Sequence, residues 1–359
     1  MSTNVKFNSS HSGFFRTLRT RTDAYFKDNQ ISPTGNAELY SKTIILFCVF
    51  LVCYTILVFF TPASVLVSLS LCMLLGFCLA VMGFNIMHDG AHGSYSRSKR
   101  VNELMALTLN FMGGNSFLWK QKHNVNHHTY TNVEGIDDDI DVKPFMRMHP
   151  EQKKLWVHRF QHIYALLLYG LTYLSWIFIV DFQKYFTGKT TESTPLPKMD
   201  MKEHFTFWLS KLIHYTVFLF IPFFMVGVLA TIAGYLVMAL VTGLVIAVTF
   251  QLAHVVEETQ FVAPPEGETL QLENNWAIHQ LNSTANFGTG SRALNWVLGG
   301  LNFQVEHHLF PRISHVHYPQ INKIVRATCA EYGVVYHEFP SMFSALRSHL
   351  LHLKKVGLA

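Results

Sequence analysis

The chain has 359 residues and a formal net charge of +5; half of its residues are hydrophobic and 14% are charged. Soluble globular domains are roughly 25% charged, so this composition and the long apolar runs exclude an ordinary soluble protein. The mild positive charge forms no basic stripe, which argues against a nucleic-acid partner and favours basic loops beside anionic lipid head groups. Four of the five cysteines lie inside apolar runs, which offers neither a disulfide framework nor a thiolate metal motif.

A first pair of apolar runs follows a polar segment at residues 1–42, which is expected to form a short cytoplasmic N-terminal arm. The run at 43–60 is long enough to cross a bilayer core of about 30 Å at about 1.5 Å per residue. The turn at 61–64 carries no charge, and a second run at 65–87 leads back to His88. Basic residues flank this hairpin but are absent from its turn, so the positive-inside rule predicts that both ends face the cytoplasm.

A second hairpin is predicted from the runs at about 206–228 and 231–251, which an uncharged link joins and which lead to His254. The segment at 163–180 is also apolar enough to cross. However, a crossing there would put histidine clusters that must share one site on opposite faces of the membrane. We therefore predict that 163–180 is an interfacial or half-embedded helix.

The predicted fold class is an all-α integral membrane protein, with two transmembrane helical hairpins (four spans) under a cytoplasmic helical cap. The expected divisions are the arm at 1–42, a membrane domain at 43–320 and a C-terminal cytoplasmic helical tail at 321–359. The helical segment at 101–118 is expected to lie along the membrane surface. The expected location is a bacterial cell membrane or the endoplasmic reticulum, multi-pass, with the active site facing the cytoplasm.

Three histidine clusters stand next to apolar runs and read HDGAH at 88–92, HNVNHH at 123–128 and QVEHH at 304–308. On an α-helix His123 and His127 share a face, whereas His128 points about 100° away and would not serve the same metal position. This geometry favours two metal ions over one. A further histidine, at 254, stands alone at a span end, as the one at 88 does. The ligand candidates are His88, His92, His123, His127, His128, His254, His307 and His308.

The identity of the metal does not follow from the spacing. A set of imidazoles suits zinc, copper or iron, although eight of them exceed what one tetrahedral zinc uses. The acidic run at 137–139 is either a solvated loop or a source of negative charge that offsets two cations. His279, His158 and His162 are not expected to be ligands, and His315 is expected near the centre without binding metal.

The motifs HDGAH, HNVNHH followed by TYTN, and QVEHHLFP resemble those of the membrane fatty acid desaturases, in order and spacing, over roughly residues 40–320. The glutamine that opens the third motif is similar to the front-end subgroup of linoleoyl-type Δ6 enzymes. The resemblance implies two iron ions, O2 as co-substrate, and removal of two hydrogens from adjacent methylenes to leave a cis double bond. His254 matches an extra family ligand, and Gln304 stands where fuller ligand sets have histidine. Whether Gln304 binds iron directly, through water or not at all is left open by the resemblance.

The resemblance also implies partners. Fused front-end enzymes carry their own cytochrome domain and this sequence shows no such motif, so we expect an external electron donor, cytochrome b5 or a ferredoxin. The expected substrate is an acyl-CoA or acyl-lipid in the bilayer. Five basic residues are either contacts for a phosphate-bearing head group or ordinary loop residues: Lys120, Lys122, Lys143, Arg147 and Arg159.

Two other functions remain open at this point. A fatty acyl or lipid hydroxylase, or a related monooxygenase, would use the same histidine framework. A metal transporter would place ionisable ligands within its spans. The histidine clusters instead stand at span ends, which favours an enzyme over a transporter.

Overall fold

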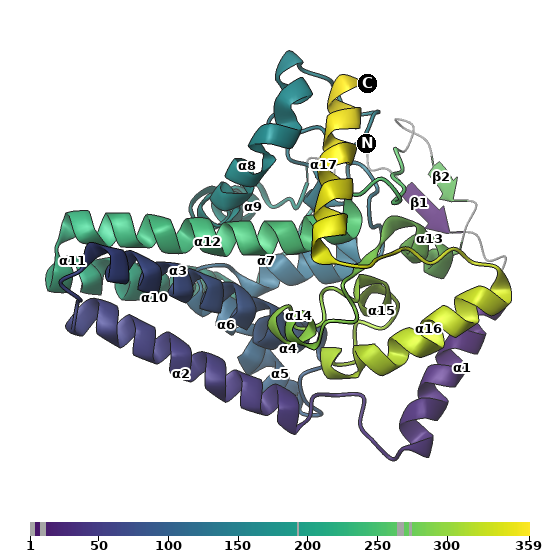
Figure 1. Ribbon diagram of the computed structural model, residues 1–359, viewed down its shortest axis with the longest axis horizontal. Helices are drawn as coiled ribbons and strands as arrows, with labels where there is room; N and C mark the ends of the chain where they lie inside the picture. Colours follow the sequence, from purple (N-terminus) through teal and green to yellow (C-terminus); the bar gives the residue numbers. More distant parts are fainter. Residues whose placement is uncertain (1–3, 8–11, 192–193, 264–268, 273–274) are drawn as a thin grey trace.

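The computed structural model describes residues 4–7, 12–191, 194–263, 269–272 and 275–359 (Figure 1). The α-helices of these residues are α1 (Ser12–Asp28), α2 (Ala37–Phe59), α3 (Val65–Met82), α4 (His88–His92), α5 (Lys99–Ala106), α6 (Thr108–Phe111), α7 (Ser116–Lys120), α8 (Gln161–Ser175), α9 (Asp181–Thr187), α10 (Met201–Tyr215), α11 (Ile221–Val226), α12 (Val228–His254), α13 (Trp276–Ser283), α14 (Arg292–Val297), α15 (Gln304–Leu309), α16 (Tyr318–Tyr332) and α17 (Met342–Leu358). The π-helical turns are η1 (Gly83–Met87), η2 (Gln121–His127), η5 (Trp176–Val180) and η6 (Thr216–Phe220), and the 3₁₀ turns are η3 (Asp138–Ile140), η4 (Trp156–Phe160) and η7 (His315–His317). The strands β1 (Asn4–Phe7), β2 (Thr269–Leu272), β3 (Asn286–Phe287) and β4 (Glu338–Phe339) form two parallel pairs, β1–β2 and β3–β4.

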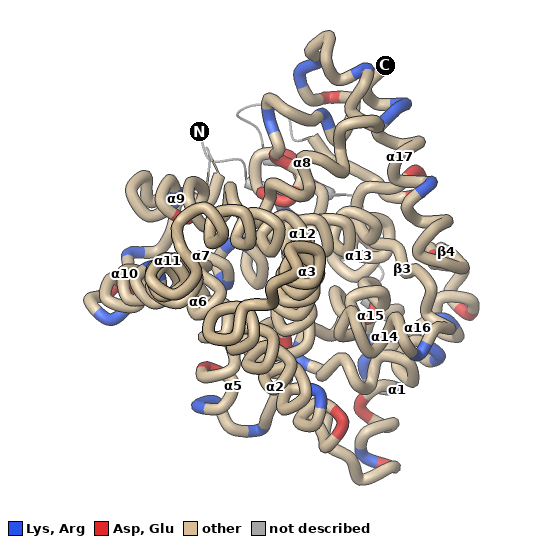
Figure 2. The backbone as a smooth tube through the Cα atoms, turned by 60° about the vertical axis from the view of Figure 1, so that its left-hand side comes forward, with Lys and Arg blue, Asp and Glu red and all other residues tan. Residues whose placement is uncertain are grey.

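The fold is therefore mostly helical, and the two short strand pairs are a departure from the all-α prediction. Five helical segments of the described residues are long and apolar enough to span a membrane: 37–59, 65–92, 156–187, 201–226 and 228–254. Lys, Arg, Asp and Glu are absent from α3, α11 and α12, and Figure 2 shows the charged residues around the outside of this bundle. These features define a multi-pass membrane protein.

Helices α2 and α3 lie where the sequence predicts the first two apolar helices. Asn36 caps α2, because its side-chain Oδ1 accepts a hydrogen bond from the backbone N–H of Glu38 at 2.9 Å. Ser64 caps α3, and the helix then continues through η1 and α4 without a break to His92. The first histidine motif therefore lies at the end of a long helix, as predicted.

The second hairpin turns earlier than predicted. The expected link lay near 229–231, whereas α11 ends at Val226 and α12 begins at Val228. Gly227 makes the turn with φ +88°, a conformation that side chains with a Cβ disfavour. An apolar sequence hides this break, because its hydropathy does not change across the glycine.

Helix α12 is the centre of the bundle and packs against both α3 and α8. Two glycines permit the close approach. A Cβ on Gly76 would lie 2.3 Å from the carbonyl oxygen of Met238, and a Cβ on Gly243 would lie 2.5 Å from that of Gly170. In Figure 1, α2, α3 and α12 extend along the long axis, whereas α8 crosses α12 obliquely.

The cap is built from segments at both ends of the chain. Helix α1 packs on α16, and α17 packs on α8 and α12. The predicted helical segment at 101–118 is divided among α5, α6 and α7, and Gly113, with φ +94°, makes the break between α6 and α7. A Cβ on Gly113 would lie 2.7 Å from the ring of His214 on α10, so this turn is seated against a bundle helix.

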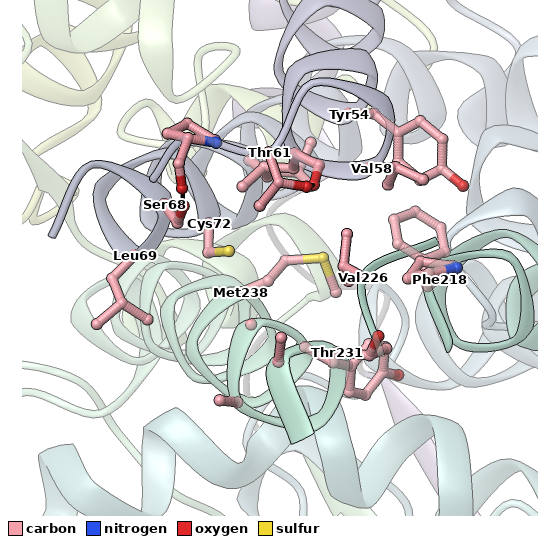
Figure 3. A pocket seen from close by; sticks show the side chains of 18 of the residues that line it. Tyr54, Val58, Thr61, Ser68, Leu69, Cys72, Phe218, Val226, Thr231 and Met238 are labelled. Atoms are coloured by element: carbon pink, nitrogen blue, oxygen red, sulfur yellow. Dashed lines mark hydrogen bonds between the residues drawn. The ribbon is translucent and has the colours of Figure 1, made fainter. Parts of the chain in front are cut away.

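An apolar cavity of about 380 Å³ lies between the two hairpins (Figure 3). Its walls include Val58 of α2, Cys72 of α3, Val226 of α11 and Met238 of α12. The cavity is near the turns of the hairpins, at the end of α3 and α12 opposite to the histidines.

Candidate metal centre

Four chain segments bring the eight predicted histidines into one buried cluster. Motif one is at the end of the span that includes α3, motif two is on η2, motif three is on α15, and His254 ends α12. All eight side chains are buried or nearly so. The ring centroids of His88 and His307 lie 4.4 Å apart, and those of His127 and His254 lie 4.7 Å apart. The structure thus brings together every histidine that was predicted as a ligand.

The second motif is not wound as predicted. We expected an α-helix with His123 and His127 paired and His128 directed elsewhere. The segment is a π-helix, in which the backbone N–H of His128 donates to the carbonyl oxygen of His123 at 3.0 Å. This winding places residues five apart on one face, and Nε2 of His128 lies 3.2 Å from Nε2 of His123. The winding therefore differs from the predicted α-helix. The groups of ligand atoms nevertheless keep the two histidines apart, because His123 shares a group with His127 and Asp139 whereas His128 shares one with His307 and His308.

The histidines divide into two main groups. The ligand atoms of His88, His92, His123 and His307 all lie within 4.8 Å of one another. Those of a second group lie within the same distance: His127, His254 and His308. His128 forms a group with His307 and His308, which belong to different main groups, so it lies between the two. A further group, made by His123, His127 and Asp139, also joins the two. These overlapping groups are compatible with a metal site, and two neighbouring metal positions stay a prediction.

The outward ring nitrogens are held by hydrogen bonds. Such contacts orient a metal-binding imidazole and define which nitrogen is free to bind. The anchored pairs are Nδ1 of His127 with Asp137 Oδ2 (3.0 Å), Nδ1 of His254 with the Ser283 carbonyl (3.2 Å), Nδ1 of His307 with the Tyr318 hydroxyl (3.1 Å) and Nδ1 of His308 with Gln280 Oε1 (2.7 Å). In each of these four rings the remaining nitrogen, Nε2, is buried and has no hydrogen-bond partner among the described residues.

These inward nitrogens fit a metal. A buried imidazole nitrogen without a partner is costly unless something binds it. Nε2 of His123 lies 3.3 Å from Nε2 of His88 and 3.2 Å from that of His128. Two nitrogens bonded to one ion at about 2.0–2.1 Å would be separated by about 3 Å, so these spacings suit shared ligation.

The protonation state also suits metal binding. Burial, followed by repulsion from neighbouring histidines, holds the pKa of His123, His128, His307 and His308 well below the usual range. These rings are neutral near pH 7 and keep the lone pair that a metal requires. For His127, burial lowers the pKa, but the charge of Asp137 and its hydrogen bond outweigh that effect and raise it overall.

The acidic run at 137–139 is part of the centre's surroundings and is not a solvated loop. Asp137 is buried against His127, and Oδ2 of Asp139 lies 3.4 Å from the same Nδ1. Lys122 lies 2.7 Å from Asp139 and 3.2 Å from Asp138. Of the two alternatives, the structure favours carboxylates that offset the charge of cations in the centre.

Three of the basic residues considered for head-group binding are already used within the chain. Lys122 is paired with the acidic run, and Lys143 lies 3.0 Å from Glu134. Arg147 donates to the carbonyl oxygens of Gln152 and Val356, each at 2.7 Å. These three side chains make contacts within the protein, which agrees with the alternative that they are ordinary loop residues and not head-group contacts.

Gln304 is fully buried, and neither its Oε1 nor its Nε2 has a hydrogen-bond partner among the described residues. Its side chain lies beside His254. The structure therefore shows no hydrogen bond between the Gln304 side chain and a neighbouring backbone group among the described residues. The position agrees with a side chain directed at the centre.

Several contacts of the centre were not identified from sequence. Trp119 stacks on His123, with ring centroids 4.3 Å apart, and closes one side of the cluster. Gln280 and Tyr318 anchor ligand candidates from positions that no motif marks, so the sequence offers no clear signal for them. His315, expected nearby, has Nδ1 3.1 Å from the Asp89 carboxylate.

The histidines set aside from sequence lie outside the cluster. Nε2 of His279 is 2.9 Å from the carbonyl oxygen of Thr131, and Nε2 of His158 is 2.9 Å from that of Pro144. Neither joins a group of ligand atoms in the described residues. The i, i+4 spacing of His158 and His162 therefore did not by itself indicate metal binding.

The fold and the site define a multi-pass membrane protein with a buried polyhistidine centre. A family model described as fatty acid desaturase matches residues 63–340. The chain belongs to the fatty acid desaturase family and is an acyl desaturase, an oxidoreductase.

Curated relatives match almost the whole chain. It is 36% identical to an sn-1 linoleoyl-lipid 6-desaturase of Synechocystis sp., over 99% of this chain and 98% of the relative. It is 37% identical to an enzyme of that name from Arthrospira platensis, over 96% and 93%. It is 39% identical to an acyl-lipid (8-3)-desaturase of Physcomitrium patens, over 96% of this chain and 72% of the relative.

Proposed function

We propose that the chain introduces a cis double bond into the acyl chain of a membrane lipid, at two irons held by the eight histidines. The observation that carries the proposal is that four of these rings, His127, His254, His307 and His308, have an anchored Nδ1 and a buried Nε2 without a partner among the described residues. The names of the relatives favour an acyl-lipid as substrate, and two of them favour a linoleoyl chain and position 6.

Each part of the site has a distinct task in this proposal. When bound, the irons supply O2 activation and the oxidising power for the removal of two hydrogens. One ion would be held by His88, His92, His123 and His307, and the other by His127, His254 and His308 with Gln304 beside them. His128 would lie between the two positions.

The rest of the chain orients these ligands and excludes water. Asp137, Gln280 and Tyr318 fix the direction of their imidazoles, so little reorganisation is needed when metal binds. Trp119 and Phe250 pack against His123, and the ring centroids of Phe250 and His123 lie 5.9 Å apart. A dry, rigid pocket keeps the methylenes in register and limits side reactions.

The proposed topology has four crossings, with both termini and the site on the cytoplasmic side. The segment at 163–180, which lies within the apolar helical stretch 156–187, is proposed to be interfacial or half-embedded, because a crossing there would put the histidine clusters on opposite faces. The proposed divisions remain an arm at 1–42, a membrane domain at 43–320 and a tail at 321–359. The electron donor is proposed to be a separate cytochrome b5-like protein or a ferredoxin.

Expression in a host that contains linoleoyl lipids but lacks this desaturation tests the function. The expected result is a new cis double bond, located by mass spectrometry of derivatised fatty acids, and two irons per purified chain. A hydroxylated product would instead assign the chain to the monooxygenases on the same framework. Unchanged fatty acids in the presence of iron-loaded protein and a working electron donor would contradict the proposal.

A further inference from the structure

A second cavity, of about 620 Å³, lies in the cap beside the first turn of α2. Helices α14 and α16 and the turn η7 form its other walls. Its size is in the range of pockets that hold small ligands, about 300–1,000 Å³. None of the eight ligand candidates lines it, so it is distinct from the metal centre.

The lining of this cap cavity is cationic. Among the described lining residues, four are Lys or Arg and one is acidic: Lys42, Arg292, Lys323 and Arg326 against Glu38. Arg326 is already paired with Glu338, at 3.0 Å. Arg292 and Lys323 are exposed and have no ion pair within the described residues, so the rim keeps two positive charges for a ligand.

Lys42 forms the buried end of the cavity. Its side chain is 2% exposed, and its Nζ lies 3.3 Å from Nε2 of His315 and 3.4 Å from Oδ1 of Asn85. Its nearest carboxylate among the described residues, Glu38, is 3.6 Å away and 56% exposed. The buried carboxylate of Asp89 also acts on it, but from beyond His315 and without direct contact. A buried ammonium is costly without a close counter-ion, so this position favours an anion in the cavity.

The cavity is close to both the membrane surface and the metal centre. Lys42 is near the cytoplasmic end proposed for the first span, and the Trp296 ring lies 5.5 Å from its Nζ. Tryptophan and lysine at such a depth are typical of the head-group layer. On the inner side, His315 contacts the carboxylate of Asp89, which is adjacent to His88.

We propose that the cap cavity binds the phosphate group of the acyl carrier, with Lys42 at its base and Arg292 and Lys323 at its rim. The proposal rests on the desaturase function above and adds the substrate class, a phosphate-bearing acyl carrier. Lys42 lies at the buried end of the cavity, where a small anionic group can reach it. The surface of an acidic protein would contact the rim residues but would not reach Lys42. A phospholipid and an acyl-CoA share this chemistry, and the experiment distinguishes them.

The test measures binding without turnover. The full chain in nanodiscs of neutral lipid is titrated with three probes: a short-chain phosphatidylglycerol, an acyl-CoA, and a diacyl glycolipid without phosphate. The variants are Arg292→Glu and Lys323→Glu, and the matched control is Arg347→Glu, an exposed cation on α17 outside the cavity. We expect each rim variant to weaken binding of the phosphate-bearing probe about tenfold, because a charge-assisted contact becomes a repulsion. The glycolipid and the control should not change.

The outcomes separate the possibilities. If the rim variants bind only phosphatidylglycerol more weakly than wild type does, the acyl carrier is a phospholipid. If they bind only acyl-CoA more weakly, the acyl carrier is coenzyme A. Equal affinity of wild type and both rim variants for both phosphate probes would overturn the proposal. So would rim variants that lose affinity for an acidic electron-transfer protein but not for lipid, which would assign the surface to that partner. Binding that behaves as expected in a chain that desaturates nothing would contradict the function and leave this inference standing.

A variant at the buried base provides an independent measurement. Lys42→Met keeps an unbranched side chain one atom shorter and removes its charge, and we expect it to weaken binding of the same phosphate probe. Turnover distinguishes binding from catalysis, because the rim variants should raise KM for the phosphate-bearing substrate and leave kcat unchanged. A loss of kcat at constant KM would contradict a role in substrate binding.

Discussion

Oδ2 of Asp137 lies 3.0 Å from Nδ1 of His127, while the Nε2 of the same ring is buried without a partner. The carboxylate therefore fixes the orientation of an imidazole whose other nitrogen is available for metal. Ten residues separate the two in sequence, and a turn brings them together, because the backbone N–H of Asn132 also donates to Asp137 at 2.8 Å. This contact gives the first prediction.

Replacing Asp137 by Asn should weaken metal binding while the chain still folds. The amide keeps an oxygen for the backbone N–H groups but loses the charge that orients and polarises His127. Loss of such an outer contact typically costs about 10–100-fold in metal affinity or activity. Iron competition with a chelator measures the change, with Asp141→Asn as the control. Equal affinity in wild type and Asp137→Asn would contradict the role assigned to this carboxylate.

The eight-histidine assignment predicts that removing one ligand removes metal and activity together. His127→Ala, His254→Ala and His307→Ala should each lose iron and turnover, because the remaining ligands depend on a shared geometry. His279→Ala is the matched control, since its ring is buried nearby but bonds a backbone carbonyl. Iron content of purified protein is measured beside fatty-acid profiles. Full iron and normal turnover in any of the first three would disprove that assignment.

Gln304 is predicted to contribute to the metal surroundings through its amide, directly or through a bound water. Gln304→Ala should abolish turnover while folding survives, and Gln304→His should retain some activity because imidazole is a stronger ligand. A purely structural amide would instead cost about 1–3 kcal/mol of stability and leave activity in the folded fraction. Thermal unfolding and turnover of the same preparations separate these results. A stable, fully active Gln304→Ala enzyme would end this hypothesis.

Reporter fusions test the membrane topology. Fusions after residues 150, 190 and 300 should report the cytoplasm, and fusions after 62 and 230 should report the opposite face. The reason is that the histidine clusters must meet on one side, whereas the hairpin turns carry no charge. Fusions at 150 and 190 on opposite faces would show that 156–187 crosses, and an outward reporter at 150 or 300 would contradict a shared site.

The pair of Glu134 with His149 predicts a pH effect. The contact of its Oε2 with Nε2 of His149, at 3.0 Å, is the main cause that lowers the pKa of Glu134 to about 2 from 4.5. The folded carboxylate binds protons less readily than the unfolded one, so its stabilisation is present above about pH 4.5 and is lost as the pH falls toward 2. Glu134→Gln should flatten the decline of unfolding temperature across this window. A decline as steep in the variant as in wild type would exclude Glu134 as its source.

The histidines that gather in the cluster were identifiable from sequence because each histidine motif stands at the end of an apolar run, where hydropathy and spacing coincide. Even the isolated His254 was identified in this way, and its ring centroid lies 4.7 Å from that of His127. The first hairpin was also predictable, since Asn36 and Ser64 are local caps and the turn at 61–64 interrupts the apolar pattern. The turn at Gly227 was misplaced because the apolar pattern continues across it.

By itself, the sequence determined the class of protein, the apolar runs and the histidines that meet, since these depend on hydropathy and short spacings along the chain. The tertiary structure decided which histidines share a position. Nε2 of His123 and Nε2 of His128 lie 3.2 Å apart because the segment is wound as a π-helix, a choice that local spacing does not reveal. It also decided that Asp137 anchors His127 and that Lys42 lies at the base of a cationic cavity. Such contacts join residues from separate elements, so they exist only once those elements pack together.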